Sequence, residues 1–136
     1  MAVIAVERGY AKTRKAVLEG LIAYNRAQSG VTRSKRLAVS LKQGGTITGG
    51  VTGNVWMGVL FIELFWISAK HRRKGHGAAI IKTLEDKARD AGAGLAYVDT
   101  FDFQAPGFYK KQGYREFGEL TGYPGGHTRY WLAKKL

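Results

Sequence analysis

The sequence predicts an α/β fold in which a mixed β-sheet carries helices on its faces. Residues 59–67 form a nearly unbroken apolar run, which is typical of a strand buried on both faces. Residues 80–91 then show an amphipathic helical pattern, and residues 95–100 have the composition of a further strand. Because strand–helix–strand connections are right-handed and join parallel strands, these two strands are expected to run parallel.

The segment before the apolar run is expected to contain one helix and two strands. Apolar residues recur at helical spacing over residues 13–25, and the helix is expected to end before Ser29-Gly30. Alternation over residues 37–41 predicts a half-buried strand. Gly44-Gly45 then turns the chain into a second strand, from residue 46 to about residue 55.

The central strand and helix carry finer expectations. The length of the strand at 59–67 leaves room for a β-bulge. On the outer side of the following helix, Lys82–Asp86 and Glu85–Arg89 are spaced to pair at i,i+4. Gly92 is well placed to end this helix.

A short helix and two strands complete the pattern. The helix is expected over about residues 105–112, with Pro106 in its first turn. Residues 114–120 and 128–133 have strand patterns and are joined by a turn at 123–126. No internal repeat, linker or low-complexity segment interrupts this order, which favours a single domain of 136 residues.

Composition excludes several classes of site. The hydrophobic content of 45% and charged content of 24% are typical of a folded globular protein. The absence of cysteine excludes disulfides, thiolate metal sites and cysteine nucleophiles. No carboxylate or histidine lies at ligand spacing beside His71, His76 or His127, so no metal is expected. The apolar run at residues 2–6 is too short for a signal peptide or a membrane span, which favours a cytoplasmic protein without a membrane partner.

The net charge of +12 would attract polyanions such as nucleic acid or a phosphorylated cofactor. The basic residues are spread along the chain without an aromatic-rich RNA-binding signature or a basic recognition helix, so a nucleic-acid partner is not favoured. The basic cluster at 70–74 differs from the others because of its setting. A strand ends near Ser68, a basic loop follows, and a helix opens at Gly75–Gly77. Such a loop points backbone N–H groups and a helix N-terminus at one small volume, which predicts a phosphate pocket.

Two motifs resemble those of the GNAT N-acetyltransferases, of the small single-domain bacterial type. The loop lacks the Gly-Lys-Ser/Thr ending of a nucleotide P-loop, but Arg72-x-x-Gly75-x-Gly77 resembles the acyl-CoA pyrophosphate loop of that family. Ala105-Pro-Gly-Phe-Tyr-Lys-Lys-Gln-Gly-Tyr114 resembles its Ala-x-x-Phe-Tyr-x-x-x-Gly-Phe segment. The resemblance runs from about Leu37 to the C-terminus. It implies a mostly antiparallel central sheet with a parallel, splayed pair of strands in its middle and helices on both faces.

The resemblance also implies the reaction: acetyl-CoA-dependent N-acetylation of a primary amine, on a small molecule or a peptide, by direct attack on the thioester without a metal. Gly75 and Gly77 would let the phosphates approach, and a strand bulge would open a gap for the pantetheine arm. The family often has asparagine where this chain has Asp102, so Thr100 or Gln104 would replace that contact. The residues expected to bind the cofactor are Phe65, Trp66, Ile67, Arg72, Arg73, Lys74, Gly75, His76, Gly77, Ala78, Thr100, Gln104, Phe108 and Tyr109.

The resemblance suggests Tyr109 and Glu63 as catalytic residues. Tyr109 would lie near the thioester sulfur and act as an acid, the alternative being that it only packs its helix against the sheet. Glu63 is the only charged residue in the run 59–67 and would accept the proton of the amine or bind it. Its alternative is a structural ion pair with an arginine such as Arg129. The thioester carbonyl would be polarised by the N–H of Phe65 or Trp66, or of a residue just beyond.

Other functions remain open at this stage. The same fold could serve as a non-catalytic acyl-CoA-binding module, and a basic nucleic-acid-binding protein is a more remote alternative. The sequence does not identify the acceptor and leaves a homodimer open. The residues that could line an acceptor pocket are Trp56, Trp66, Tyr97, Asp99, Tyr123, His127 and Trp131.

Overall fold

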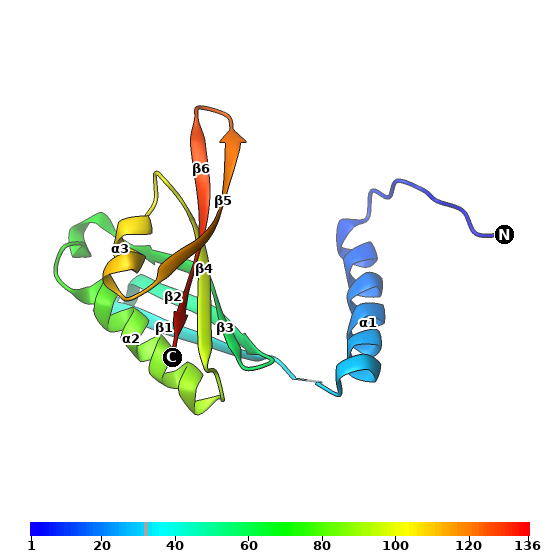
Figure 1. The fold of residues 1–136 in the computed structure, drawn as a ribbon, viewed down its shortest axis with the longest axis horizontal. Coiled ribbons are helices and arrows are strands. Elements are labelled where there is room, and N and C mark those ends of the chain that lie inside the picture. Colours follow the sequence, from blue (N-terminus) through cyan, green and yellow to red (C-terminus); the bar gives the residue numbers. More distant parts are fainter. Residues whose placement is uncertain (32) are drawn as a thin grey trace. The chain divides into compact units, whose positions relative to one another are not determined.

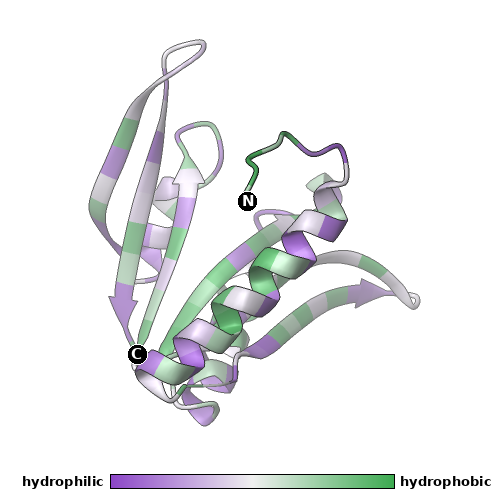
Figure 2. Ribbon diagram, turned by 90° about the vertical axis from the view of Figure 1, so that its right-hand side faces the viewer, coloured by the Kyte–Doolittle hydropathy of each residue, from purple (hydrophilic) through white to green (hydrophobic). Residues whose placement is uncertain are grey.

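The computed structural model describes residues 1–31 and 33–136, which form two compact units, Met1–Arg33 and Ser34–Leu136. The first unit contains helix α1 (Tyr10–Ser29), which extends the predicted helix at both ends. Hydrophobic and hydrophilic residues interleave along α1 (Figure 2), as the helical spacing of the sequence predicts. The helix ends at Gly30, whose φ of 71° is the left-handed conformation that glycine adopts most readily at a helix C-terminus.

The second unit is built on one sheet of six strands in the order β1-β2-β3-β4-β6-β5 (Figure 1). Neighbouring strands are antiparallel except β3 and β4, which are parallel in the middle of the sheet. The predicted fold class, a mixed and mostly antiparallel sheet with one parallel pair and helices, is therefore confirmed. The strands are β1 (Lys35–Gln43), β2 (Thr46–Trp56), β3 (Val59–Ile67), β4 (Leu95–Phe101), β5 (Arg115–Tyr123) and β6 (His127–Lys135).

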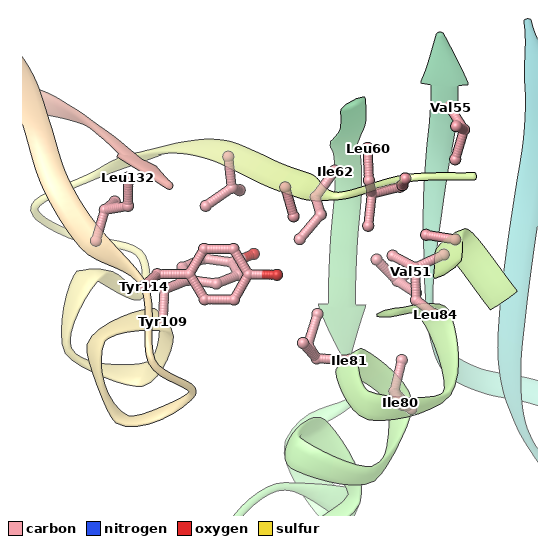
Figure 3. Close-up of a cluster of buried hydrophobic side chains, with 14 of the residues drawn as sticks. Val51, Val55, Leu60, Ile62, Ile80, Ile81, Leu84, Tyr109, Tyr114 and Leu132 are labelled. Carbon is pink, nitrogen blue, oxygen red and sulfur yellow. The ribbon is translucent and has the colours of Figure 1, made fainter. Parts of the chain in front are cut away.

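Two helices of this unit enclose the core against one face of the sheet. Helix α2 (His76–Asp90) connects the parallel strands, as expected for a strand–helix–strand unit. Helix α3 (Pro106–Lys111) has proline in its first turn and follows β4. Side chains from α2, α3 and the sheet form one buried cluster, part of which is drawn in Figure 3. Its members include Val51, Val55, Leu60, Ile62, Ile81, Leu84, Tyr109 and Leu132.

The expected pair between Glu85 and Arg89 is wrong, because Glu85 is buried. Its Oε2 accepts a hydrogen bond of 2.7 Å from the Tyr114 hydroxyl, and its Oε1 accepts one of 2.9 Å from Lys134 Nζ. Burial, together with this bond to Glu85, raises the pKa of Tyr114 well above its usual range. Arg89 pairs with Asp86 instead, and the expected pair between Lys82 and Asp86 is present at 3.2 Å. Glu85 falls on the stripe that faces the core, where a carboxylate is stable only when it is fully hydrogen-bonded.

Strand β3 contains the expected bulge but is buried on one face rather than both. Thr52 of β2 pairs with Leu64 and Gly53 pairs with Ile62, so Glu63 is the extra residue of the bulge. Beyond it, Leu64 is 70% exposed and Trp66 is 55% exposed. The expectation fails because α2 and α3 cover the same face of the sheet as Leu60 and Ile62. The apolar run therefore has one face in the core and an exposed face beside the bulge.

Leu84 offers a test of this core. It has 0% exposure, so truncation to alanine removes its contacts with the sheet and leaves a cavity. We expect Leu84→Ala to lower the free energy of unfolding by about 3 kcal/mol, measured by urea denaturation. The matched control is Leu120→Ala on β5, where leucine is 51% exposed and the expected loss is within about 0.5 kcal/mol. Equal losses in the two variants would contradict the description of the core.

Candidate active site

A cavity of about 730 Å³ lies where β3 and β4 separate. Parallel pairing between these strands ends at Ile62 and Val98, and residues beyond both positions line the cavity. Its walls come from β3, from the loop into α2 and the first turn of that helix, and from β4, the loop after it and α3. The lining residues are Ile62, Glu63, Leu64, Phe65, Trp66, Ile67, Arg72, Arg73, Gly75, Gly77, Ala78, Val98, Asp99, Thr100, Phe103, Gln104, Ala105, Phe108 and Tyr109.

The start of α2 presents backbone donors without a capping side chain. Gly75 at the N-cap has a φ of 81°, and no side chain bonds to the first turn. The first helical bond runs from Ala79 N to Gly75 O, so the N–H groups of the three residues before Ala79 precede the hydrogen-bonded ladder. No acidic residue lies in this turn. Unpaired N–H groups at an uncapped, positively charged helix start are suited to an anion, which fits the pyrophosphate of CoA.

The loop that leads into α2 is held against the end of β3. Arg72 Nε donates a hydrogen bond of 2.8 Å to Ile67 O. Arg73 has a φ of 59°, which is uncommon outside glycine and turns the chain towards Gly75. Both arginines line the cavity, so positive charge gathers at the same end as the free N–H groups.

Gly77 is required by packing inside the protein. A Cβ at this position would lie 3.0 Å from the Phe108 ring, closer than side chains normally approach. The Phe108 ring is also stacked on Phe65, with centroids 5.2 Å apart. The glycine therefore lets the first turn of α2 approach α3 and β3. Gly75 differs, because a Cβ there would meet nothing within 4 Å and its positive φ is what favours glycine.

The hydrogen-bond pattern of β3 shows which of its backbone amides point towards the gap between β3 and β4. Ser68 N donates to Thr48 O at 2.8 Å, so the Ser68 amide faces β2. Because successive amides of a strand alternate, the Trp66 amide also faces β2, whereas those of Phe65 and Ile67 face the other way. The Ile67 carbonyl agrees with this assignment, since it accepts from Arg72 on the side of the loop. Trp66 is therefore not placed to polarise a carbonyl in the gap through its N–H.

Tyr109 lines the cavity from α3 and is 4% exposed. Its ring meets Phe65, Phe108 and Tyr114 edge-on, with centroids 5.3 to 6.2 Å apart. Burial, followed by the negative charge of Asp99, raises the pKa of Tyr109 to about 12. A phenol with a raised pKa keeps its proton throughout the neutral range, so Tyr109 can donate a hydrogen bond but is not a base at pH 7.

The loop between β4 and α3 is fixed by the two residues expected to replace the missing asparagine. Thr100 Oγ1 accepts from Ala105 N at 3.2 Å, and Gln104 Oε1 accepts from Phe101 N at 2.8 Å. Both side chains also line the cavity. Asp102 is not among the lining residues; its carboxylate accepts from Thr128 N and pairs with His127.

The carboxylates of the cavity come from β3 and β4. Glu63 is exposed at the bulge. The proposed alternative partner of Glu63, Arg129, pairs with Asp99 instead: its Nε and Nη2 donate to Asp99 Oδ1 at 3.0 and 2.5 Å. The guanidinium of Arg129 also lies 5.0 Å from the centroid of Trp131. The pairing of Arg129 with Asp99 leaves Glu63 outside any ion pair found among the described residues.

All but two of the residues expected to be catalytic or to bind the cofactor line this one cavity; Lys74 and His76 do not. Of the residues considered for an acceptor pocket, Trp66 and Asp99 line it, whereas Trp56, Tyr97, Tyr123, His127 and Trp131 do not. Sequence reasoning gave Asp99 little weight and did not select Leu64, Phe103 or Ala105. The register of the parallel strands would have indicated Asp99, because Asp99 directly follows Val98 on β4 just as Glu63 follows its partner Ile62 on β3. Within residues 1–31 and 33–136, no helix is long and apolar enough to cross a membrane, and no group of three or more potential metal-ligand side chains comes together.

Comparison with known proteins agrees with the fold. The chain is 40% identical over 93 residues to a blasticidin-S acetyltransferase of Streptomyces morookaense, in an alignment that covers 68% of each chain. A crystal structure of an acetyltransferase from Bacillus cereus superposes with a TM-score of 0.86 at 31% identity, covering 100% of each chain. A Bacillus anthracis protein solved in complex with acetyl coenzyme A shares the fold, with a TM-score of 0.66, 18% identity and coverage of 74% of this chain and 62% of that one.

Residues 7–114 match the model of the Acetyltransferase (GNAT) family, and this match includes the loop at the start of α2, both parallel strands and α3. The chain therefore belongs to the GNAT family of acetyltransferases.

Proposed function

We propose that this protein transfers an acetyl group from acetyl-CoA to the nitrogen of a primary amine, by direct attack of the amine on the thioester. The observation that carries the proposal is a single cavity that joins the uncapped start of α2 to the gap between β3 and β4. A pyrophosphate and a thioester held there would be linked through one continuous space. The buried Tyr109 hydroxyl belongs to the same wall as the gap.

Donor binding uses charge and backbone geometry together. The N–H groups of His76, Gly77 and Ala78 would donate to the pyrophosphate, with Arg72 and Arg73 supplying opposite charge. The backbone N–H of Phe65, which points into the gap, would donate to the thioester carbonyl oxygen. That bond strengthens as negative charge develops on the oxygen, so it favours the transition state over the bound substrate.

Glu63 is the residue that we assign to proton removal. An alkylamine of ordinary pKa, about 10.4, costs about 4.6 kcal/mol to neutralise at pH 7, so a nearby carboxylate is useful. Glu63 would take one proton from the ammonium group, directly or through a water molecule. Nitrogen then forms the new bond to the acyl carbon while the carbon–sulfur bond breaks. Of the two protons that the ammonium ion loses, one ends on the CoA thiol and one is released to solvent.

Tyr109 would assist the departing sulfur by hydrogen bonding. Its pKa of about 12 exceeds that of an ordinary thiol, about 8.5, so complete proton transfer to the thiolate would be uphill. A hydrogen bond from the phenol still stabilises the thiolate while it forms. Tyr109 is therefore assigned a donor role at sulfur, and the thiolate takes its proton later from solvent.

An amine panel tests the function directly. The panel contains n-butylamine, 1,4-diaminobutane, a lysine-containing peptide, kanamycin and blasticidin S, the last because a relative is named for it. We expect thiol release from acetyl-CoA to depend on at least one amine and to yield an N-acetylated product by mass spectrometry. Binding of acetyl-CoA without turnover of any amine would favour the alternative, a non-catalytic acyl-CoA-binding module.

Ala78→Glu tests the donor site at the start of α2. A glutamate in the first turn suits the helix and should preserve or raise its stability, but its charge opposes the pyrophosphate. We expect the Kd for acetyl-CoA to rise at least about tenfold by titration calorimetry, with an unchanged melting temperature. Ala79→Glu adds the same charge one residue further along, outside this cavity, and should change the Kd less than about threefold. Equal weakening by both variants would count against the site.

Tyr109→Phe tests the assigned hydroxyl. Removal of one preorganised donor should lower kcat by about 10²-fold while the Kd for acetyl-CoA stays within about threefold. Because the pKa is raised to about 12, the neutral phenol persists up to that pH. The wild-type profile of kcat should therefore show no falling limb from Tyr109 between pH 6 and about 10. Full kcat in the variant would leave Tyr109 with a packing role alone.

A further inference from the structure

Two carboxylates stand at equivalent positions on the strands that separate. Ile62 and Val98 form the last pair of the parallel ladder, and the next residues are Glu63 and Asp99. Both line the cavity. The sequence contains 22 lysines and arginines but only 10 acidic residues. Two acidic residues at one gap therefore concentrate negative charge locally in a protein that is basic as a whole. The opposite end of the cavity carries Arg72 and Arg73.

Both carboxylates belong to the face of the sheet opposite the core. Ile62 and Val98 are buried with the core, and the alternation of β4 puts Asp99 on the other face, beside Trp131 of β6. On β3 the bulge leaves Glu63 and Leu64 both exposed between inward-facing neighbours. Alternation after Ile62 thus puts Glu63 on the same face as Asp99, on the side of the gap away from the core, and the bulge keeps Leu64 on that face as well.

Arg129 holds Asp99 by only one of its two oxygens. Both guanidinium bonds, from Nε and Nη2, go to Oδ1. In the part of the chain that the structure describes, Oδ2 accepts no side-chain hydrogen bond. The negative charge of Asp99 also reaches Tyr109, where it contributes to the raised pKa of the phenol. Asp99 is therefore held by Arg129 through one oxygen, and its other oxygen is open to a ligand.

We propose that Asp99, fixed by Arg129, binds the acceptor as an ammonium ion through Oδ2, and that Glu63 across the gap takes its proton. This assignment rests on the proposed N-acetyltransferase function. Asp99 is then a specificity residue: it forms no covalent bond and selects acceptors whose reacting nitrogen arrives as a positively charged ammonium group. Arg129 is a positioning residue, because its bonds to Oδ1 aim Oδ2 at the gap. The cavity then has a positively charged end that binds the pyrophosphate and a negatively charged end that binds the amine.

Asp99→Asn separates this role from a purely structural ion pair. Asparagine keeps a carbonyl oxygen for Arg129 and removes only the charge. For every panel amine that the wild-type protein acetylates, we expect KM to rise about 10- to 100-fold, while kcat and the Kd for acetyl-CoA stay within about threefold. Asp90→Asn, an exposed loss of the same charge at the end of α2, is the matched control and should leave KM within about twofold.

Variants of Arg129 test the positioning role. Arg129→Gln should raise KM for the same amines, and Arg129→Lys should restore part of the loss because it again supplies positive charge beside Asp99. Melting temperatures of all variants report folding separately. An unchanged KM in Asp99→Asn, in a protein that acetylates the panel amines, would overturn the assignment and leave the N-acetyltransferase function standing. Acetyl-CoA binding without turnover of any amine would overturn both proposals.

Discussion

The termination of the parallel ladder between β3 and β4 is the constraint on which the site depends. Pairing stops after Ile62 and Val98, and β3 carries its extra residue, Glu63, directly beyond that point. Backbone groups that would otherwise bond across the sheet are left facing a cavity. In most sheets such groups would cost free energy, because buried N–H and C=O groups need partners. Under the proposed function the gap would hold the pantetheine chain of the acyl donor, and the Phe65 amide would be available to it for that reason.

Packing on the covered side of the sheet holds the pieces of the cavity together. Gly77 lets Phe108 lie against the first turn of α2, and Phe108 in turn stacks on Phe65. The donor-binding turn, the helix that carries Tyr109 and the strand with the free amide therefore share one aromatic contact. The geometry of the site thus rests on packing in the core.

Much of this could be predicted from the sequence, and the failures have physical reasons. The strand at Val59–Ile67, the loop at Arg72–Gly77 and the helix with Tyr109 follow from periodicity and motif spacing. The partner of Glu85, Lys134, and the partner of Arg129, Asp99, could not be predicted in this way. Each partner lies far away in the sequence and is brought into contact by tertiary packing. Burial was predicted for both faces of β3, and the exposure of one face was missed for a similar reason: an apolar run does not reveal which face the helices cover. Asp99 was given little weight because it is notable only for lying opposite Glu63, and that correspondence depends on how β3 and β4 pair.

The hydrogen bonds of the buried Glu85 carboxylate make the two sides of the sheet unequal in the substitutions that they tolerate. This carboxylate links α2 to Tyr114, which directly follows α3, and to Lys134 on β6, so substitutions in the donor half disturb a shared network. On the opposite face, Leu64 and Trp66 are exposed and can be replaced at small cost to stability. Mutational tolerance is thus unequally distributed across the sheet. Under the proposed function, the exposed residues on the acceptor side of the cavity would therefore tolerate substitution more readily than the packed residues that hold the acyl donor.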